Sequence, residues 1–462
     1  MPTAVRRDQS ARLNSEPGSA PPDFAPTGPR SAPCSHPSGS PGPAVAPRRA
    51  VSWPAGRSGH RDTMRRLPRP RLRTADGHDR EERRASWVEL FFDLAFAGAV
   101  GQLAGAFQDH PALGTLGRFV MVFIPIWWLW VQFSFYADRH ESDDAAHRVP
   151  ILAAILLCVG LAASAPRALA GHSDGFVIAF ACMRGLQLVL YARARHHLPA
   201  TRALYNCYLI CFGIGGALWL SSLAVPDPAR YAVWVAALLV DGIGSLAMLA
   251  PRRQVPLNPA HLADRFQIFV LIVLGESVAR LISAAAMKPW SLQLAIVLAA
   301  AVITLAALWW AWLRAADDQA LDSQLTIAKF TALNLSVVAG IAAASAGLHI
   351  AILAADGAGT IAAAPRAALY GGVSVYLLAT AILPSRKMTR AARTARLATS
   401  LASMGLVFMG AIVEPVYLVP ALTVVLGLGL WTERESTSRP GRRALKPLTA
   451  APQNQLSGVS GN

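Results

Sequence analysis

Residues 87–107 read WVELFFDLAFAGAVGQLAGAF. It is about long enough to cross a bilayer, because roughly 20 apolar residues, each rising about 1.5 Å, span the ~30 Å hydrocarbon core. It nevertheless carries Glu89 and Asp93 near its start and Gln102 further along. A carboxylate within a membrane helix costs roughly 2.5–3.5 kcal/mol on insertion scales, so it usually faces a protein interior or a wet cavity. The stretch therefore predicts a membrane helix whose acids face other protein or water.

The composition divides the chain into two tails and one apolar region. The 462 residues are 53% hydrophobic and 15% charged, with a formal net charge of +16. Residues 1–86 are rich in Pro, Ser, Gly and Arg, so we predict a disordered basic tail, and we predict a disordered cytoplasmic tail at 433–462. Met64 precedes two arginines, and we hypothesise that translation starts there. The excess positive charge lies in tails and loops, which favours an anionic membrane surface over nucleic acid.

Between the tails, apolar windows alternate with short polar loops and predict about 12 transmembrane helices. The windows are 87–107, 115–137, 149–165, 175–193, 203–224, 230–250, 266–286, 290–313, 327–353, 366–384, 395–413 and 415–432. Only Glu414-Pro415 separates the last two, which form either two helices or one kinked helix. The even-numbered loops hold most bases, among them Arg139, Arg265 and Arg396, whereas the odd-numbered loops add little beyond Arg167, Arg230, Lys288 and Arg366. The positive-inside rule then predicts a multi-pass protein of the cell membrane with both termini cytoplasmic.

A tryptophan cluster recurs in the two halves of the apolar region. Trp127, Trp128 and Trp130 lie near the end of the second window, and Trp309 and Trp310 lie near the end of the eighth, with acidic residues following each cluster (Asp138 through Asp144, then Asp317-Asp318). The preceding helices also align loosely, Gly101-Gln102 with Gly275-Glu276. We predict two parallel six-helix repeats, 87–250 and 264–432, in an all-α polytopic membrane protein. The alternative is that these tryptophans are ordinary residues of the membrane interface.

The buried polar residues are the candidates for function. Glu89 and Asp93 lie four residues apart and share one helix face, where they form either an ion or proton entry site or pairs with Arg139 or Arg265. The Gly101–Gly105 spacing allows another helix to approach closely. Glu276 lies near the middle of a window and is either a functional carboxylate or a protonated group that bonds across helices.

Asp241 and Arg184 are further ionisable residues in apolar windows, and they pair either with each other or with the acids above. The predicted ion pathway or buried polar network comprises Glu89, Asp93, Gln102, Asp241, Asp264, Arg265, Glu276 and Ser277. No cysteine or histidine pattern indicates a metal site or a cofactor.

Two motifs carry a family resemblance that covers roughly residues 85–431. Residues 88–94, VELFFDL, resemble the opening signature of the bacterial low temperature requirement A family, and Asp264-Arg265 with the LGES run at 274–277 resembles its second signature. The chain departs from the family where Trp312-Leu313-Arg314 stands for Tyr-Phe-Asp and Asn334-Leu335-Ser336 for His-Leu-Pro. The resemblance implies a multi-pass bacterial membrane protein, and it implies no settled activity.

Three functions remain open from the sequence. The intramembrane carboxylates favour a transporter or channel for a small ion or solute. A non-catalytic membrane factor for cold or stress adaptation needs no buried acids. A membrane enzyme acting on a lipid-like substrate is less favoured, because the sequence shows no nucleophile–base set, Walker loop or metal pattern. The expected partners are the lipid bilayer, a small ion or solute, and other copies of the chain.

Overall fold

The computed structural model describes residues 71–72, 86–141, 145–246, 257–316, 321–357, 359–386 and 388–438, all within one compact unit, 64–462. Most of both predicted tails lies outside the described residues, and so does the proposed start at Met64. The acidic residues Asp143-Asp144 and Asp317-Asp318 also lie outside them. The described part is mainly helical, and its two short strands, β1 (Arg71–Leu72) and β2 (His140–Glu141), pair antiparallel.

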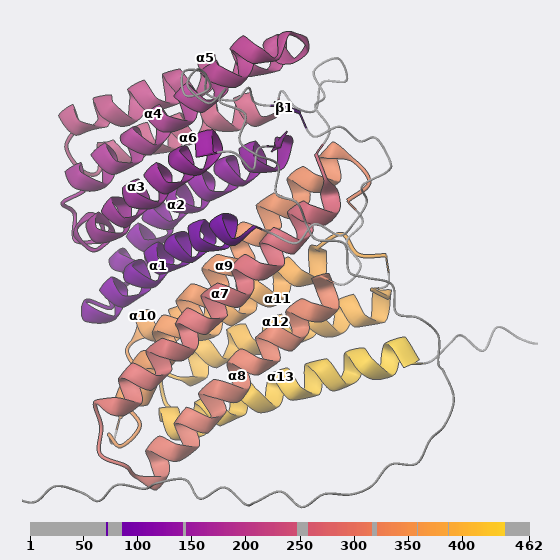
Figure 1. Cartoon of the computed structure of the whole chain (residues 1–462). Coiled ribbons are helices and arrows are strands. Elements are labelled where there is room, and N and C mark those ends of the chain that lie inside the picture. The colour runs from indigo at the N-terminus through magenta and orange to yellow at the C-terminus, as the bar shows by residue number, and fades with distance from the viewer. Residues whose placement is uncertain are drawn as a thin grey trace, which may run out of the picture. The chain divides into compact units, whose positions relative to one another are not determined.

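The helices follow one another along the whole described apolar region (Figure 1). Their bounds are α1 Trp87–Asp109, α2 Leu113–Arg139, α3 Ala145–Leu169, α4 Asp174–His197, α5 Arg202–Ser221, α6 Ala229–Leu246, α7 Pro259–Ala286, α8 Leu292–Ala316, α9 Gln324–Leu353, α10 Ala363–Arg366, α11 Gly372–Ile382, α12 Arg390–Met409 and α13 Pro415–Ser438. Short 3₁₀ turns occupy Pro199–Thr201 and Ser222–Ala224, and a π-helical turn, Ala367–Gly371, joins α10 to α11.

Among the described residues, ten helices are long and apolar enough to cross a membrane, which confirms an all-α polytopic protein. The two other predicted spans, 366–384 and 395–413, are also helical, in the α10–α11 run and in α12. A turn after Met409 ends α12, and Pro415 is the first residue of α13, so the last two spans are separate helices. Pro fits the first helical turn because its missing N–H has no partner there in any case.

Most helices extend beyond the predicted windows, and α7 and α13 extend furthest at one end because polar residues continue them. α7 begins at Pro259, ahead of the predicted 266, and the side chain of Asn258 caps it by accepting a hydrogen bond from the backbone N–H of His261. α13 continues through Ser438, so the predicted disordered tail does not begin at 433. Arg265 and Arg396, counted above as loop bases, lie inside helices and are buried in ion pairs, the latter with Glu433 at 2.6 Å. Hydropathy windows leave out these polar helical turns, although their charged residues Arg265 and Glu433 are buried in ion pairs with other helices.

The helices of the two halves contact one another in the same order. In the first half α3 packs on α1 and α4, α4 on α5, and α5 on α6. In the second half α9 packs on α7 and α11, α11 on α12, and α12 on α13. A parallel repeat would produce this order, and the repeat with its boundaries, 87–250 and 264–432, remains a prediction. The halves meet where α1 and α2 contact α7 and α9, and we call this contact the seam.

Inside the second half, α9 and α11 cross closely at a pair of glycines. A Cβ atom on Gly340 would lie 2.6 Å from the carbonyl oxygen of Gly372, and one on Gly372 would lie 2.8 Å from the carbonyl oxygen of Gly340. Both distances are well below van der Waals contact, so neither position has room for a side chain. Membrane helices gain much of their association energy from such backbone approach, since lipid removes the hydrophobic drive between helices.

We therefore expect Gly340→Ala to destabilise the protein by about 1–3 kcal/mol, because the new methyl group would push the backbone of α11 away. Gly405→Ala in α12 is the matched control, since nothing lies within 4 Å of that position. Thermal unfolding of both variants in detergent would measure the difference. Equal midpoints for the two alanine variants would contradict the close crossing.

Candidate functional site

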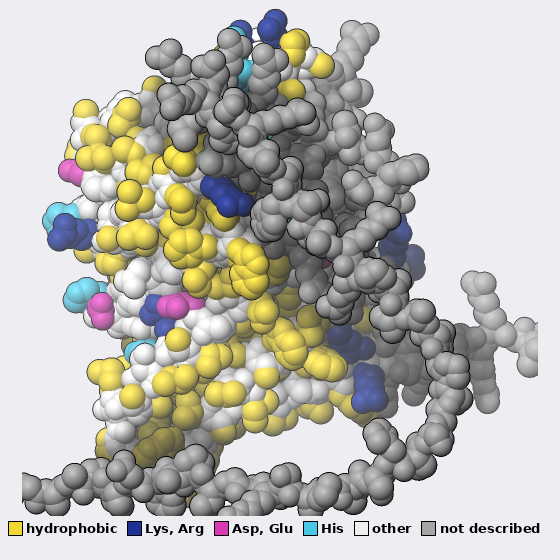
Figure 2. Space-filling view, viewed as in Figure 1, with side chains coloured by type: hydrophobic (Ala, Val, Ile, Leu, Met, Phe, Trp, Pro, Cys, Tyr) yellow, Lys and Arg dark blue, Asp and Glu magenta, His cyan; other side chains and the backbone are white. Residues whose placement is uncertain are grey.

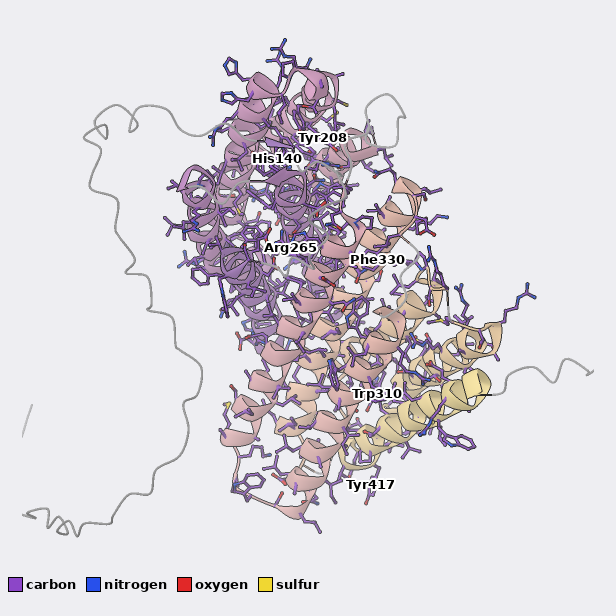
Figure 3. All side chains as sticks on the ribbon, turned by 45° about the vertical axis from the view of Figure 1, so that its right-hand side comes forward. His140, Tyr208, Arg265, Trp310, Phe330 and Tyr417 are labelled. Carbon is purple, nitrogen blue, oxygen red and sulfur yellow. The ribbon has the colours of Figure 1, made fainter. Side chains whose placement is uncertain are left out.

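A buried ion pair joins the two halves near the N-terminal ends of α1 and α7. The Nη2 atom of Arg265 donates to Oδ1 of Asp93 at 2.6 Å, and the indole Nε1 of Trp130 in α2 donates to the same oxygen at 2.8 Å. The side chains of Arg265 and Asp93 are 1% and 0% exposed. Figure 3 shows Arg265 where the two sets of helices meet. Of the two partners considered from the sequence, Arg265 is thus the one that pairs with Asp93.

His261 links two further carboxylates beside this pair. Its Nδ1 lies 3.0 Å from Oδ1 of Asp138, and its Nε2 lies 3.6 Å from Oε2 of Glu89. The other oxygen of Asp138 accepts a hydrogen bond at 2.9 Å from the backbone N–H of Asn258. A neutral imidazole donates from one nitrogen and accepts at the other, whereas a protonated one donates from both. His261 can therefore change its bonding between the two carboxylates by gaining or losing one proton.

The residues of this group, which we call the seam cluster, are Glu89, Asp93, Trp130, Asp138, His261 and Arg265. The sequence reasoning missed His261 because it precedes the apolar window. A signal was present, since His261 and Arg265 lie four residues apart and so share one face of a helix that Asn258 and Pro259 begin. Glu89 also has a local role, because it forms a capping box with Ser86 that fixes the start of α1.

Glu276 forms a second charged contact on the seam. It pairs with Arg280 at 3.1 Å, one turn along α7, and Arg280 also donates to the carbonyl oxygen of Gly101 in α1. A Cβ on Gly101 would collide with the Glu276 carboxylate, and one on Gly105 would lie 2.8 Å from Nη1 of Arg280. The Gly101–Gly105 spacing, which the sequence predicted would let another helix approach closely, thus leaves room for the Glu276–Arg280 ion pair. The Glu276 side chain is 38% exposed, and Figure 2 shows charged side chains set in a mainly hydrophobic face.

The remaining predicted polar residues lie apart from the seam cluster. Arg184 and Asp241 pair with each other inside the first half, and Arg184 also donates to Gln187 at 2.7 Å. Gln102 and Asp264 are exposed, and Ser277 donates to the carbonyl oxygen of Val273 in its own helix at 2.8 Å. The structure therefore brings together Glu89, Asp93 and Arg265, and it separates Asp241 and Gln102 from them.

The two tryptophan clusters have different surroundings. Trp127 and Trp130 are buried, and Trp130 packs against Phe269 of α7 with ring centroids 4.2 Å apart. Trp128 is half-buried. Trp309 and Trp310 are 39% and 53% exposed and contact each other. In the part of the chain that the structure describes, no group of three or more His, Cys, Asp or Glu residues has a geometry suited to a metal ion.

Comparison with known proteins assigns the family. Residues 84–430 match the bacterial low temperature requirement A protein family, so the chain belongs to this family. The chain is also similar to an uncharacterised protein of Rhizobium meliloti (strain 1021), with 25% identity over 284 residues, which covers 56% of this chain and 68% of that protein. The matched region includes every residue of the seam cluster.

The buried pair makes a quantitative prediction. We expect Arg265→Gln and Asp93→Asn each to lower the free energy of unfolding by about 3–5 kcal/mol, because each leaves its partner charge buried and unpaired. The double variant should lose less than the sum, since it leaves no orphan charge from this pair. Denaturant titration in mixed micelles would measure the four free energies.

The exposed pair Arg386–Asp322, with side chains 60% and 66% exposed, is the control for that cycle. Its disruption should cost less than about 1 kcal/mol, because solvent screens exposed charges. Strict additivity of Arg265→Gln and Asp93→Asn would show that the two side chains do not depend on each other.

Proposed function

We propose that this member of the low temperature requirement A family is a transporter or channel for a small ion or solute, and that its pathway follows the seam. The observation that carries the proposal is the seam cluster, in which titratable side chains from α1, α2 and α7 are buried together. Ionisable groups inside a membrane protein are costly, and their common use is on an ion or proton pathway.

The composition of the cluster favours a cation or a proton. It holds three carboxylates, Glu89, Asp93 and Asp138, against one guanidinium and one imidazole. With Arg139 also counted, whose guanidinium packs on the rings of Phe135 and Tyr208, three carboxylates face two guanidiniums, so the cluster carries excess negative charge while His261 is neutral. A site with excess carboxylate in a low-dielectric interior attracts positive charge.

The seam also places a constraint on how such an ion would move. Asp93 and Gly101 are separated by eight helical residues, or about 12 Å along α1, and buried apolar side chains such as Phe96 and Val100 fill that interval. Because a proton cannot cross this distance in one step, passage from the seam cluster to Glu276 requires water or a movement of the halves. A carrier in which α1 and α7 shift against each other would satisfy this requirement.

We also propose which membrane holds the chain and how the chain is oriented in it. We place the chain in the bacterial inner membrane with both termini cytoplasmic, on the strength of the basic even-numbered loops. The seam cluster, at the start of α1 and α7, then lies toward the cytoplasmic side. Association with other copies of the chain is part of the same proposal.

Flux in proteoliposomes that contain the full chain tests the proposal, with dyes for protons and potassium inside the vesicles. The wild type should dissipate an imposed gradient, whereas Glu276→Gln and the double variant Glu89→Gln/Asp93→Asn should lose most of the flux because their amides cannot carry the charge. Asp322→Asn, an exposed loop acid, is the control and should keep it.

Absence of flux under every gradient, with folded protein verified in the vesicles, would reject transport of these ions and favour a non-catalytic membrane factor. Flux that the amide variants leave intact would place the pathway away from the seam.

A further inference from the structure

One side of the seam exposes polar groups on the outer surface of α1 and α7, which contact each other there (Figure 1). The carboxylate of Glu276 pairs with Arg280 at 3.1 Å but is 38% exposed, and it lies against Gly101 of α1. Gln102, the next residue, is exposed, and among the described residues its amide has no hydrogen-bond partner. Both helices are long and apolar enough to span a membrane. A polar group that faces hydrocarbon is costly, so we expect a partner that bonds to these groups to cover them.

The exposed residues around these groups are small. In α7, Gly275, Ala279 and Ser283 recur every four residues and are exposed, so they form one stripe. In α1, Gly98 is half-buried one turn before the exposed amide. A Cβ atom built on Gly98 or on Gly275 would have nothing within 4 Å, so the backbone is open there. Helices in membranes associate through small residues that let their backbones approach and through hydrogen bonds between polar side chains.

We call this surface the seam face, and its members are Gly98, Gln102, Gly275, Glu276, Ala279 and Ser283. The directions of α1 and α7 decide which partner suits it. Asp93 pairs with Arg265 near the start of both helices, and further along Gly101 of α1 lies against Glu276 of α7. The two helices therefore run in the same direction, and the amide of Gln102 lies at about the same depth in the membrane as the Glu276 carboxylate.

A second copy of the chain meets the requirement that groups at equal depth face each other. Two copies in one membrane with the same orientation are related by a two-fold axis along the membrane normal, so each residue keeps its depth in both copies. The Gln102 amide of one copy can then donate to the Glu276 carboxylate of the other, and the same bond forms twice. Because Glu276 is paired with Arg280 within each copy, these side chains add no net charge to the face and the two copies do not repel.

We propose that two copies of the chain associate through the seam face, with Gln102 of each copy hydrogen-bonded to Glu276 of the other. The second copy thereby supplies the donor that covers the exposed side of the Glu276 carboxylate. This inference develops the association with other copies that the proposed function includes, and it does not require transport.

Single-molecule photobleaching of the full chain in liposomes, with one fluorophore on each chain and a range of protein-to-lipid ratios, measures the dissociation constant of the pair. The wild type should be dimeric at all but the lowest ratios. Gly275→Trp should raise the dissociation constant about tenfold or more, because the indole occupies the surface that the other copy approaches. Gly427→Trp in α13 is the matched control, since Gly427 is also exposed with nothing within 4 Å, and it should leave the constant unchanged.

Gln102→Leu tests the hydrogen bond, because it keeps the size of the side chain and removes the donor. It should also raise the dissociation constant, whereas Gln102→Asn, which keeps an amide, should recover part of the affinity. Thermal unfolding shows whether each variant is folded, and Gln102→Leu takes the place of Gly275→Trp if the latter does not fold.

A wild type that stays monomeric at every ratio would overturn the proposal, and so would a pair that Gly275→Trp and Gly427→Trp weaken equally. Water is the other occupant that would satisfy the exposed groups, and Ala279→Cys detects it. A charged, membrane-impermeant thiol reagent should modify this cysteine slowly if a second copy covers it, as measured at that residue by mass spectrometry. Fast modification in liposomes would place water on the seam face and overturn the proposal.

These measurements involve no ion gradient, so their outcome is separate from that of the flux measurement. A protein that pairs through the seam face and carries no ion would retain this inference and lose the proposed transport, and a monomer that carries ions would do the reverse.

Discussion

The contact between Asp93 and Arg265 is the constraint on which the arrangement of the two halves depends. Neither side chain can remain alone in a membrane interior, because the desolvation of a single charge costs several kcal/mol. Asp93 belongs to α1 and Arg265 to the second turn of α7. Their pairing therefore fixes α1 beside α7, and it brings α2 to the same place because Trp130 donates to the same carboxylate oxygen.

The aromatic packing around this pair strengthens it. Trp130 lies against Phe266 and Phe269, with ring centroids 4.8 and 4.2 Å apart, and these rings belong to the same helix as Arg265. They exclude water from the ion pair, and electrostatic attraction grows as the surroundings become less polar. The signature residues of the chain thus act together, since the apolar groups create the environment in which the charged groups attract strongly.

The sequence predicts some features of this site and cannot predict others, for physical reasons. Membrane helices are predictable because a span needs a long apolar run, and the pairing of Asp93 follows from the cost of an isolated charge. The partner of Glu89 was harder to predict, because His261 lies in the polar first turn of α7, which a hydropathy window assigns to a loop. The sequence could not predict which side of a helix other helices would cover. Trp309 and Trp310 share the spacing of Trp127 and Trp128 but lie on the surface. Hydropathy counts apolar residues along the chain, and only the neighbouring helices decide which of them are covered.

Glu276 places a further constraint on the seam. It lies ten residues before the end of α7, or about 15 Å along the helix, which is deep within a span. Its side chain is 38% exposed although it pairs with Arg280. A half-exposed ion pair against hydrocarbon would be desolvated without polar partners on its exposed side, whereas the buried Asp93–Arg265 pair is also compensated by the hydrogen bond from Trp130. The surface beside Gly101 and Gly105 is therefore expected to meet water or other protein in the membrane. Water there would open the seam to ions, and a second copy of the chain there would enclose the carboxylate within an oligomer.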